Sequence, residues 1–278
     1  MLCIAGWALQ SGTSHFLGQN FSKASGIQFQ SRAGTVEHAW TTSWGVSTRL
    51  IGTLIMAHAD DDGMIIPPRL APTHVVILPV TPKPDTRDAV LAAAESLACE
   101  LRAQRFHDEA VTVEVDKREL GGGTKNWEWI KKGVPVRIEI GPRDLAQGTV
   151  ALARRDRGVK EKEFLPVAGL APQIPQILRS IQDTLYARAL TYRDANTRDI
   201  DTRNEFYAFF TAENAQKPEI HGGFARAHWC GSPQCEEAIK NDLKVTIRCI
   251  PFNAPEESGT CVVCGGKSGK RVLWAKSY

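Results

Sequence analysis

The sequence lacks long hydrophobic runs and a strong net charge. No apolar stretch approaches the roughly 20 residues of a membrane-spanning helix. The first residues also lack a basic segment followed by about 7 to 15 apolar residues, the mark of a secretory signal. We therefore predict a cytoplasmic protein without a membrane partner. The formal charge is only +3 over 278 residues, which does not by itself indicate nucleic-acid binding.

Internal repeats and low-complexity tracts are also absent from the sequence, which argues against a solenoid or a disordered tract. With 42% apolar and 23% charged residues, the chain can bury hydrophobic cores, and its length favours two or three globular domains. Charge is unevenly distributed, because residues 110–160 hold eleven Lys or Arg and seven Asp or Glu. This basic surplus is compatible with phosphate contacts and equally with a solvated face.

Cysteine, in contrast, is present in an informative pattern. The total of seven is odd, and four of the seven form two closely spaced pairs near the end of the sequence: Cys230 with Cys235, and Cys261 with Cys264. This distribution favours a metal site in a reducing compartment over a disulfide framework.

The two pairs allow four thiolates to converge on one Zn²⁺, and Gly231, Gly265 and Gly266 permit the turns that this requires. A zinc ion held by four cysteines would be structural, because no coordination position stays open for a substrate. The 25 residues between the pairs exceed the usual zinc-ribbon interval, which favours two knuckles in a larger fold. The alternative is four unrelated reduced cysteines. We interpret His228 as a core or surface residue and Cys249 as a small core residue.

Hydrophobic patterning divides the chain into three predicted domains: residues 1–70, 71–173 and 174–278. The first contains a predicted loop at residues 9–23, short strands and an apolar helix over residues 48–63. The second combines β-branched strands with a long helix over residues 85–106, which predicts a mixed sheet flanked by helices. The third begins with an amphipathic helix over residues 176–197, predicted to pack on its own domain.

Two motifs suggest ligand binding but have simpler interpretations. The segment LGGGTK, residues 120–125, lacks the four-residue spacing between the first glycine and the Gly-Lys pair of a phosphate-binding loop, so we interpret Gly121–Gly123 as a flexible turn. The segment ADDDG, residues 59–63, has the oxygen ligands that Mg²⁺ takes. Three acids after an apolar helix are usually solvated, however, and they oppose the helix dipole.

A small polar cluster surrounds His15, and residues 41–48 place further small residues just before Arg49. An arginine in the first turn of a buried helix, preceded by a strand of small residues, is held still and suits the binding of a polyphosphate. The alternative is an ordinary arginine at the start of a helix.

Several long segments follow one another in a recognisable order: GTSHFLGQNFSK, TSWGVSTRLIGTLIMAHADDDGMIIPPRLAP, GVPVRIEIGPRDL, HWCGSPQCE and a terminal SY. Together they resemble prolyl-tRNA synthetases of the archaeal and eukaryotic type, over nearly the whole chain. The resemblance implies an α/β and α+β multidomain protein. Its parts are a class II catalytic domain on an antiparallel sheet, an α/β anticodon-binding domain with a mixed sheet, and a C-terminal zinc-containing α/β domain.

The same resemblance implies activation of proline with ATP and Mg²⁺, transfer of the prolyl group to tRNA(Pro), and a homodimer. Gln10 and Thr13 match residues that contact the adenine, and Arg49 matches an arginine that contacts the ATP phosphates. The proline pocket is matched by His15, Ser43 and Gly45, with Ser47 beside it. Arg49 and His15 are thus the expected catalytic residues, with His15 as a pocket wall and hydrogen-bond donor rather than a general base.

The predicted tRNA-binding residues are basic and lie in the part that resembles the anticodon-binding domain: Lys117, Arg118, Lys125, Lys131 and Arg143. Trp127 and Trp129 offer faces on which unpaired bases stack. The alternative for both tryptophans is core packing.

The chain departs from the family pattern in its first part. The dimer-forming first motif, the second motif with its ATP-clamping arginine, and the acidic loop for the proline amine have no counterpart. We therefore interpret Met1 as an internal start in an N-terminally truncated chain and expect the chain alone to be nearly inactive. The alternatives are a non-catalytic RNA-binding module and an unrelated zinc-ribbon protein. The family's closing tyrosine also suggests that the Tyr278 carboxylate reaches toward the catalytic domain.

Overall fold

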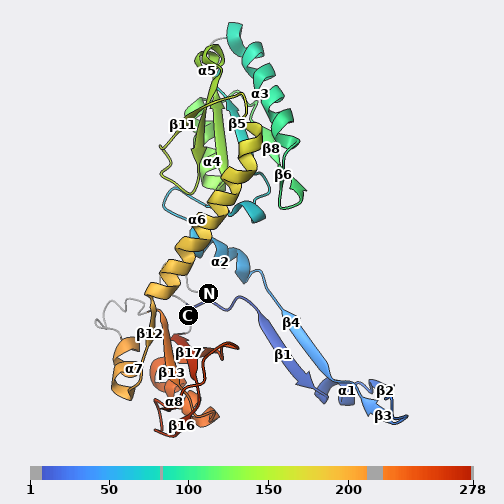
Figure 1. Ribbon diagram of the computed structural model, residues 1–278, viewed down its shortest axis with the longest axis vertical. Helices are drawn as coiled ribbons and strands as arrows, with labels where there is room; N and C mark the ends of the chain where they lie inside the picture. The colour runs from blue at the N-terminus through green and yellow to red at the C-terminus, as the bar shows by residue number, and fades with distance from the viewer. Residues whose placement is uncertain (1–7, 82–83, 212–221, 277–278) are drawn as a thin grey trace. The chain divides into compact units, whose positions relative to one another are not determined.

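The computed structural model describes residues 8–81, 84–211 and 222–276, and divides the chain into two compact units (Figure 1). Unit 1 comprises residues 1–53 and 193–278, and unit 2 comprises residues 54–192. The Tyr278 carboxylate lies outside the described residues. Among the described residues, no helix is both long and apolar enough to span a membrane.

Unit 2 is built on a five-stranded mixed sheet with the order β11-β10-β9-β5-β8. Its strands are β5 (Val75–Pro79), β8 (Val113–Val115), β9 (Val136–Ile140), β10 (Thr149–Arg154) and β11 (Glu163–Pro166). The central strand β5 runs parallel to both β8 and β9, while β10 runs antiparallel to β9 and β11. This arrangement confirms the predicted mixed sheet.

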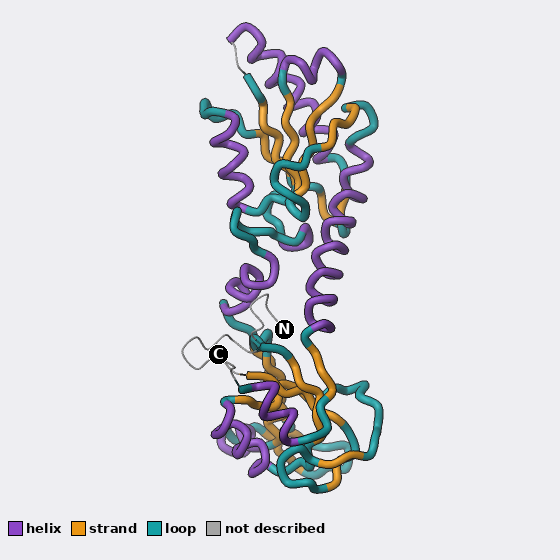
Figure 2. The backbone as a smooth tube through the Cα atoms, turned by 90° about the vertical axis from the view of Figure 1, so that its left-hand side faces the viewer, coloured by secondary structure: helices purple, strands orange, loops and turns teal. Residues whose placement is uncertain are grey.

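Strand β5 is buried on both faces, and its side chains alternate between two cores. Val75 and Ile77 contribute to the larger core, together with α3 (Arg87–Arg102), while Val76 and Leu78 pack with Trp129 of α4 (Gly122–Lys132). Figure 2 shows helices on both sides of these strands. Helix α4 begins within the three glycines that were predicted as a flexible turn.

Helix α6 (Ile174–Ala195) contributes Leu178, Ile181 and Leu185 to the larger core of unit 2. The sequence pattern placed this helix in a C-terminal domain beginning at residue 174. Its apolar stripe faces the α/β sheet instead, because the four buried residues of its first three turns pack against that sheet's core. The remaining elements of unit 2 are η1 (Pro68–Leu70), η2 (Pro84–Thr86), β6 (Arg105–Phe106), β7 (Glu109–Ala110), α5 (Pro142–Gln147) and η3 (Ala171–Gln173).

The C-terminal part of unit 1 contains a four-stranded sheet with the order β12-β13-β17-β14. Trp274 is fully buried in its core and meets Phe206 edge to face, with ring centroids 5.5 Å apart. The elements are β12 (Thr197–Asp199), α7 (Arg203–Phe210), β13 (Phe224–His228), α8 (Pro233–Leu243), β14 (Val245–Cys249), β15 (Gly259–Thr260), β16 (Lys267–Ser268) and β17 (Arg271–Lys276).

The N-terminal part of unit 1 is an antiparallel pair of strands, β1 (Thr13–Gly18) and β4 (Thr41–Gly45), followed by α2 (Arg49–His58). Three short elements lie between the strands: α1 (Asn20–Ala24), β2 (Gln28–Gln30) and β3 (Val36–His38). The prediction of a loop at residues 9–23 is wrong beyond residue 12, since β1 begins at Thr13 and α1 begins at Asn20. Residues 13–18 form a strand because their backbone groups pair with β4, a long-range partner that local polarity does not reveal.

Candidate functional site

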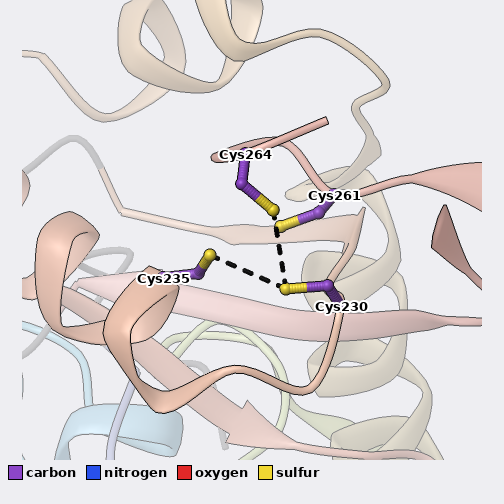
Figure 3. Close-up of side chains that lie close together, drawn as sticks. All are labelled: Cys230, Cys235, Cys261 and Cys264. Atoms are coloured by element: carbon purple, nitrogen blue, oxygen red, sulfur yellow. Dashed lines mark hydrogen bonds between the residues drawn. The ribbon is translucent and has the colours of Figure 1, made fainter. Parts of the chain in front are cut away.

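Four cysteine side chains converge in unit 1, as the paired spacing predicted. The sulfur atoms of Cys230, Cys235, Cys261 and Cys264 all lie within 4.8 Å of one another and point toward a common centre (Figure 3). The Cys230 sulfur lies 3.6 Å from that of Cys235 and 3.7 Å from that of Cys264. Tetrahedral Zn²⁺ with Zn–S bonds of about 2.3 Å separates its sulfurs by about 3.8 Å. The four thiols therefore fit one tetrahedrally bound metal ion.

Local backbone conformation brings the two pairs together. Cys261 and Cys264 lie at the tip of the β15–β16 hairpin, where the Gly265 amide donates to the Cys261 carbonyl at 2.9 Å. Gly265 has φ +73° and Gly231, next to Cys230, has φ +87°. Both values lie in the left-handed region that glycine adopts without steric cost. Cys235 occupies the first turn of α8, where Pro233 starts the helix.

The surroundings affect the four thiols differently. Burial raises the pKa of Cys235 to about 12. Burial also acts to raise the pKa of Cys261, but backbone amides of Cys264, Val263 and Cys230 outweigh it and lower that pKa to about 7. Amides that point at a sulfur favour the thiolate, which is the form that binds metal.

His228 and Cys249 are not among the residues of this cluster. His228 is buried, and its ring nitrogens contact the Ser268 hydroxyl at 3.1 Å and the Glu257 carboxylate at 3.3 Å. Cys249 is exposed at the end of β14, so its interpretation as a small core residue is wrong. A register irregularity lies at this point of the strand pairing, between Ile247 and Cys249.

The residues predicted to bind ATP and proline gather on the β1–β4 pair. His15 lies directly opposite Ser43, and Thr13 lies opposite Gly45. Because residues opposite one another in an antiparallel pair share a face, these four positions lie on one face of the hairpin. Three polar side chains and one glycine that leaves space for a ligand are thus brought together.

Arg49 joins the same group through Gln10. The Arg49 Nη1 atom donates to Gln10 Oε1 at 3.2 Å, and the Gln10 amide donates to the Thr13 hydroxyl at 2.9 Å. The Arg49 backbone amide faces the Ser47 hydroxyl at 3.4 Å, at the start of α2. Most of these side chains are exposed, and Thr13 is half-buried. The arrangement offers a cation, hydroxyls and an amide to a ligand on an open surface.

The basic residues of unit 2 have different environments. Arg118 is bonded to Asp116 and Glu128, both at 2.7 Å, and Lys117 pairs with Glu95 at 2.6 Å. Trp129 is buried and donates from its ring nitrogen to Asp116 at 2.8 Å. Hydrogen bonds from Arg118 and Trp129 hold the pKa of Asp116 well below its usual value. The Asp116 carboxylate therefore holds the side chains of Arg118 and Trp129 in place.

Lys125 is buried, and its ammonium donates to the carbonyls of Asp116 at 3.1 Å and Pro79 at 3.4 Å. Lys131 and Arg143, in contrast, are exposed. The Lys131 ammonium lies 5.6 Å from the ring centre of Trp127, whose side chain is 41% exposed. Trp127 is therefore the tryptophan whose ring is accessible, whereas Trp129 serves the core.

The first acid of ADDDG has a partner that the sequence did not reveal. Asp60 accepts two hydrogen bonds from Arg155, at 2.7 and 2.5 Å, and the Arg155 side chain is completely buried. Hydrogen bonding from Arg155 lowers the pKa of Asp60. This segment is therefore a structural attachment within unit 2, and the interpretation of Asp60 as merely solvated is wrong.

Comparison with known proteins covers both units. A family model described as anticodon binding domain matches residues 74–175, and one described as prolyl-tRNA synthetase, C-terminal, matches residues 214–278. The chain is 57% identical to proline–tRNA ligase 2 of Anaeromyxobacter dehalogenans, over 98% of this chain and 54% of the relative. It is 52% identical to proline–tRNA ligase of Protochlamydia amoebophila, with the same coverage, and 51% identical to that of Akkermansia muciniphila.

The chain thus spans about half the length of the curated relatives that it matches. The assignment to the archaeal and eukaryotic type stays a prediction. By its sequence and its two matched domains, the chain belongs to the prolyl-tRNA synthetase family.

Proposed function

We propose that this chain carries the tRNA-binding domain, the zinc domain and part of the active site of a cytoplasmic proline–tRNA ligase. The observation that carries the proposal is the hydrogen-bonded set Arg49, Gln10 and Thr13 beside the paired residues His15 and Ser43. These residues lie in a chain that is 57% identical to a proline–tRNA ligase over 98% of its length.

In this proposal Arg49 contacts the phosphates of ATP, which enters with Mg²⁺, while Gln10 and Thr13 contact the adenine. A fixed cation stabilises negative charge as it moves onto pyrophosphate. His15, Ser43, Gly45 and Ser47 form one wall of the proline pocket, which holds the carboxylate near the phosphate that it attacks.

This wall needs further protein to enclose it. On the opposite face of the β1–β4 pair, Phe16 is 74% exposed and Trp44 is 78% exposed. A two-stranded hairpin is marginally stable alone, and exposed aromatic residues favour burial against another surface. We propose that this face packs in a larger catalytic sheet, that residues 1–278 alone are nearly inactive, and that the whole enzyme is a homodimer.

The proposed tRNA surface lies on unit 2. Lys131 and Arg143 offer exposed charge, Lys117 and Arg118 offer charge that is partly paired, and Trp127 offers an open ring. We do not include Lys125 in this proposed tRNA surface, because its ammonium donates hydrogen bonds to backbone carbonyls in the interior. An aromatic face beside a cation suits unpaired anticodon bases.

The proposed metal is a structural Zn²⁺ held by Cys230, Cys235, Cys261 and Cys264. When bound, it supplies cross-linking of the β15–β16 hairpin to α8 and to the end of β13. The four-sulfur donor set and the sulfur spacing support zinc.

Proline-dependent exchange between ATP and pyrophosphate tests the proposal. It is measured on this chain and on the chain fused to the segment of the Anaeromyxobacter dehalogenans relative that this chain does not match. We expect exchange only in the fusion, and loss of exchange in the fusion that carries Arg49→Gln. Binding of tRNA(Pro) without exchange in either protein would instead support the alternative, a non-catalytic RNA-binding module. Most of the predicted site is exposed, which favours that alternative as the second candidate.

A further inference from the structure

Unit 1 contains a cavity of about 720 Å³ between the segment Ala8–Ser14 and the four-stranded sheet. Ile247, Arg248 and Cys249 of β14 form part of the opposite wall, and Arg193 lies at the end of α6. All lining residues belong to unit 1. The cavity is therefore lined both by the segment that carries Gln10 and Thr13 and by the C-terminal part of the chain that carries the cysteine cluster.

The chemistry of the lining favours an anion. It includes two arginines, Arg193 and Arg248, and no acidic side chain. Arg193 pairs at 2.6 Å with Asp194, which is not part of the lining. Hydroxyl groups of Ser11, Thr13 and Ser14 offer further donors. Arginine with hydroxyl and backbone donors is the combination that recognises phosphate.

Arg248 is partly withdrawn from bulk solvent. It is half-buried within β14. The neighbouring residues 247 and 249 line the same cavity. A cation held at low solvent exposure interacts more strongly with an anion than a mobile surface cation does.

The segment across the cavity is linked to the proposed ATP site. Gln10 accepts a hydrogen bond from Arg49 and donates one to Thr13, and both Gln10 and Thr13 line the cavity. A phosphate in the cavity would therefore lie beside the residues that we assign to ATP, opposite a cation from the C-terminal sheet.

We propose that Arg248 binds a nucleotide phosphate in this cavity and so makes the C-terminal sheet part of the ligand-binding site. The inference rests on the proposed function, which supplies the nucleotide. The phosphate comes either from ATP or from the phosphodiester chain at the 3′ end of an RNA, and the two sources are separated by experiment.

The test uses the 278-residue chain with two probes, Mg·ATP and a single-stranded RNA of sequence CCA, each measured by equilibrium dialysis. Arg248→Gln removes the charge and keeps a polar side chain, Arg248→Lys keeps the charge, and Lys240→Gln removes an exposed charge elsewhere in the same unit. Circular dichroism and thermal unfolding check that each variant is folded.

We expect Arg248→Gln to lower the affinity for at least one probe about tenfold or more. A change of this size corresponds to the loss of one charge-assisted hydrogen bond. Arg248→Lys should restore part of the loss, and Lys240→Gln should bind as the unsubstituted chain does. If only the affinity for ATP falls, ATP is the source of the phosphate. If only the affinity for the RNA falls, the source is the RNA end. For the RNA, the dependence of log affinity on log salt should also become shallower by about 0.7, as for one lost phosphate contact.

Two results would overturn the inference. One is unchanged affinity for both probes in Arg248→Gln, and the other is the absence of binding of either probe to the unsubstituted chain. Arg49→Gln distinguishes the first of these results from failure of the proposed function. If Arg49→Gln weakens ATP binding while Arg248→Gln does not, only the role of Arg248 is refuted.

Discussion

The ion pair between Asp60 and Arg155 provides the sharpest test of how unit 2 is held together. Asp60 follows α2, whereas Arg155 follows β10, so the pair joins segments 95 residues apart. Asp60→Asn removes the charge but keeps an oxygen that can accept from the Asp62 amide, which now lies 3.0 Å from Asp60. The substitution therefore tests the charge with little change in the turn.

The magnitude follows from the burial of the two partners. Breaking a fully buried pair costs about 3 to 5 kcal/mol because one charge stays uncompensated, whereas an exposed pair contributes at most about 1 kcal/mol. The Arg155 side chain is 0% exposed and the Asp60 side chain is 42% exposed. Arg155 also keeps its bonds to the carbonyls of Gly63 at 3.2 Å and Ile130 at 3.3 Å. We therefore expect a loss of about 2 kcal/mol, between the two limits.

Amide hydrogen exchange measures this loss locally. The Met64 amide donates to the Lys131 carbonyl at 3.1 Å, and the Ile66 amide donates to the Gly133 carbonyl at 3.2 Å. Exchange at these two amides therefore reports whether residues 60–66 stay attached to the end of α4. A loss of about 2 kcal/mol makes exchange at these two amides about 30-fold faster. The matched control is Asp61→Asn, which removes the same charge one residue away at an exposed position. Equal exchange in Asp60→Asn and Asp61→Asn would refute the reasoning.

Three further outcomes are expected. The purified chain should hold about one Zn²⁺, and Cys230→Ser with Cys261→Ser should release it, as metal analysis will show; retention of zinc in this double variant would contradict the site. Because the folded pKa of Asp116 is lowered, its stabilising contribution is present above pH 3.8 and is lost as pH falls below that value. In urea titrations, Asp116→Asn should therefore flatten the loss of unfolding free energy as pH falls below 3.8, and an unchanged slope there would argue against its role. Trp127→Ala should weaken binding of tRNA(Pro) about 5- to 150-fold in filter-binding assays, the range for loss of one stacked base, while an equal affinity would remove Trp127 from the proposed surface.

Local patterns were sufficient for the strands of the unit 2 sheet and for the two separate cysteine turns. The β-branched run of β5 specifies a buried strand wherever it pairs, and two short Cys spacings specify two turns whose sulfurs can meet. The convergence of Cys230 with Cys261 across 30 residues still required the fold, because spacing does not say which pairs lie together.

The features that were missed depend on partners far away in the sequence. The strand at residues 13–18 is set by pairing with β4. The membership of α6 in unit 2 is set by which sheet its stripe meets, and an amphipathic pattern does not identify that sheet. The sequence around Asp60 is typical of a solvated acid, because it does not show that Arg155 lies beside it. The sequence around Lys125 is likewise typical of a surface cation, because the contacts of Trp129 and Lys125 with Asp116 determine which side of α4 faces inward.

The amino-acid dependence of ATP–pyrophosphate exchange tests the central claim most directly. In the fusion of this chain with the unmatched segment of the Anaeromyxobacter dehalogenans relative, our account predicts exchange that requires proline and is not supported by the other standard amino acids. Exchange that responds to a different amino acid, or exchange that Arg49→Gln leaves intact, would contradict it.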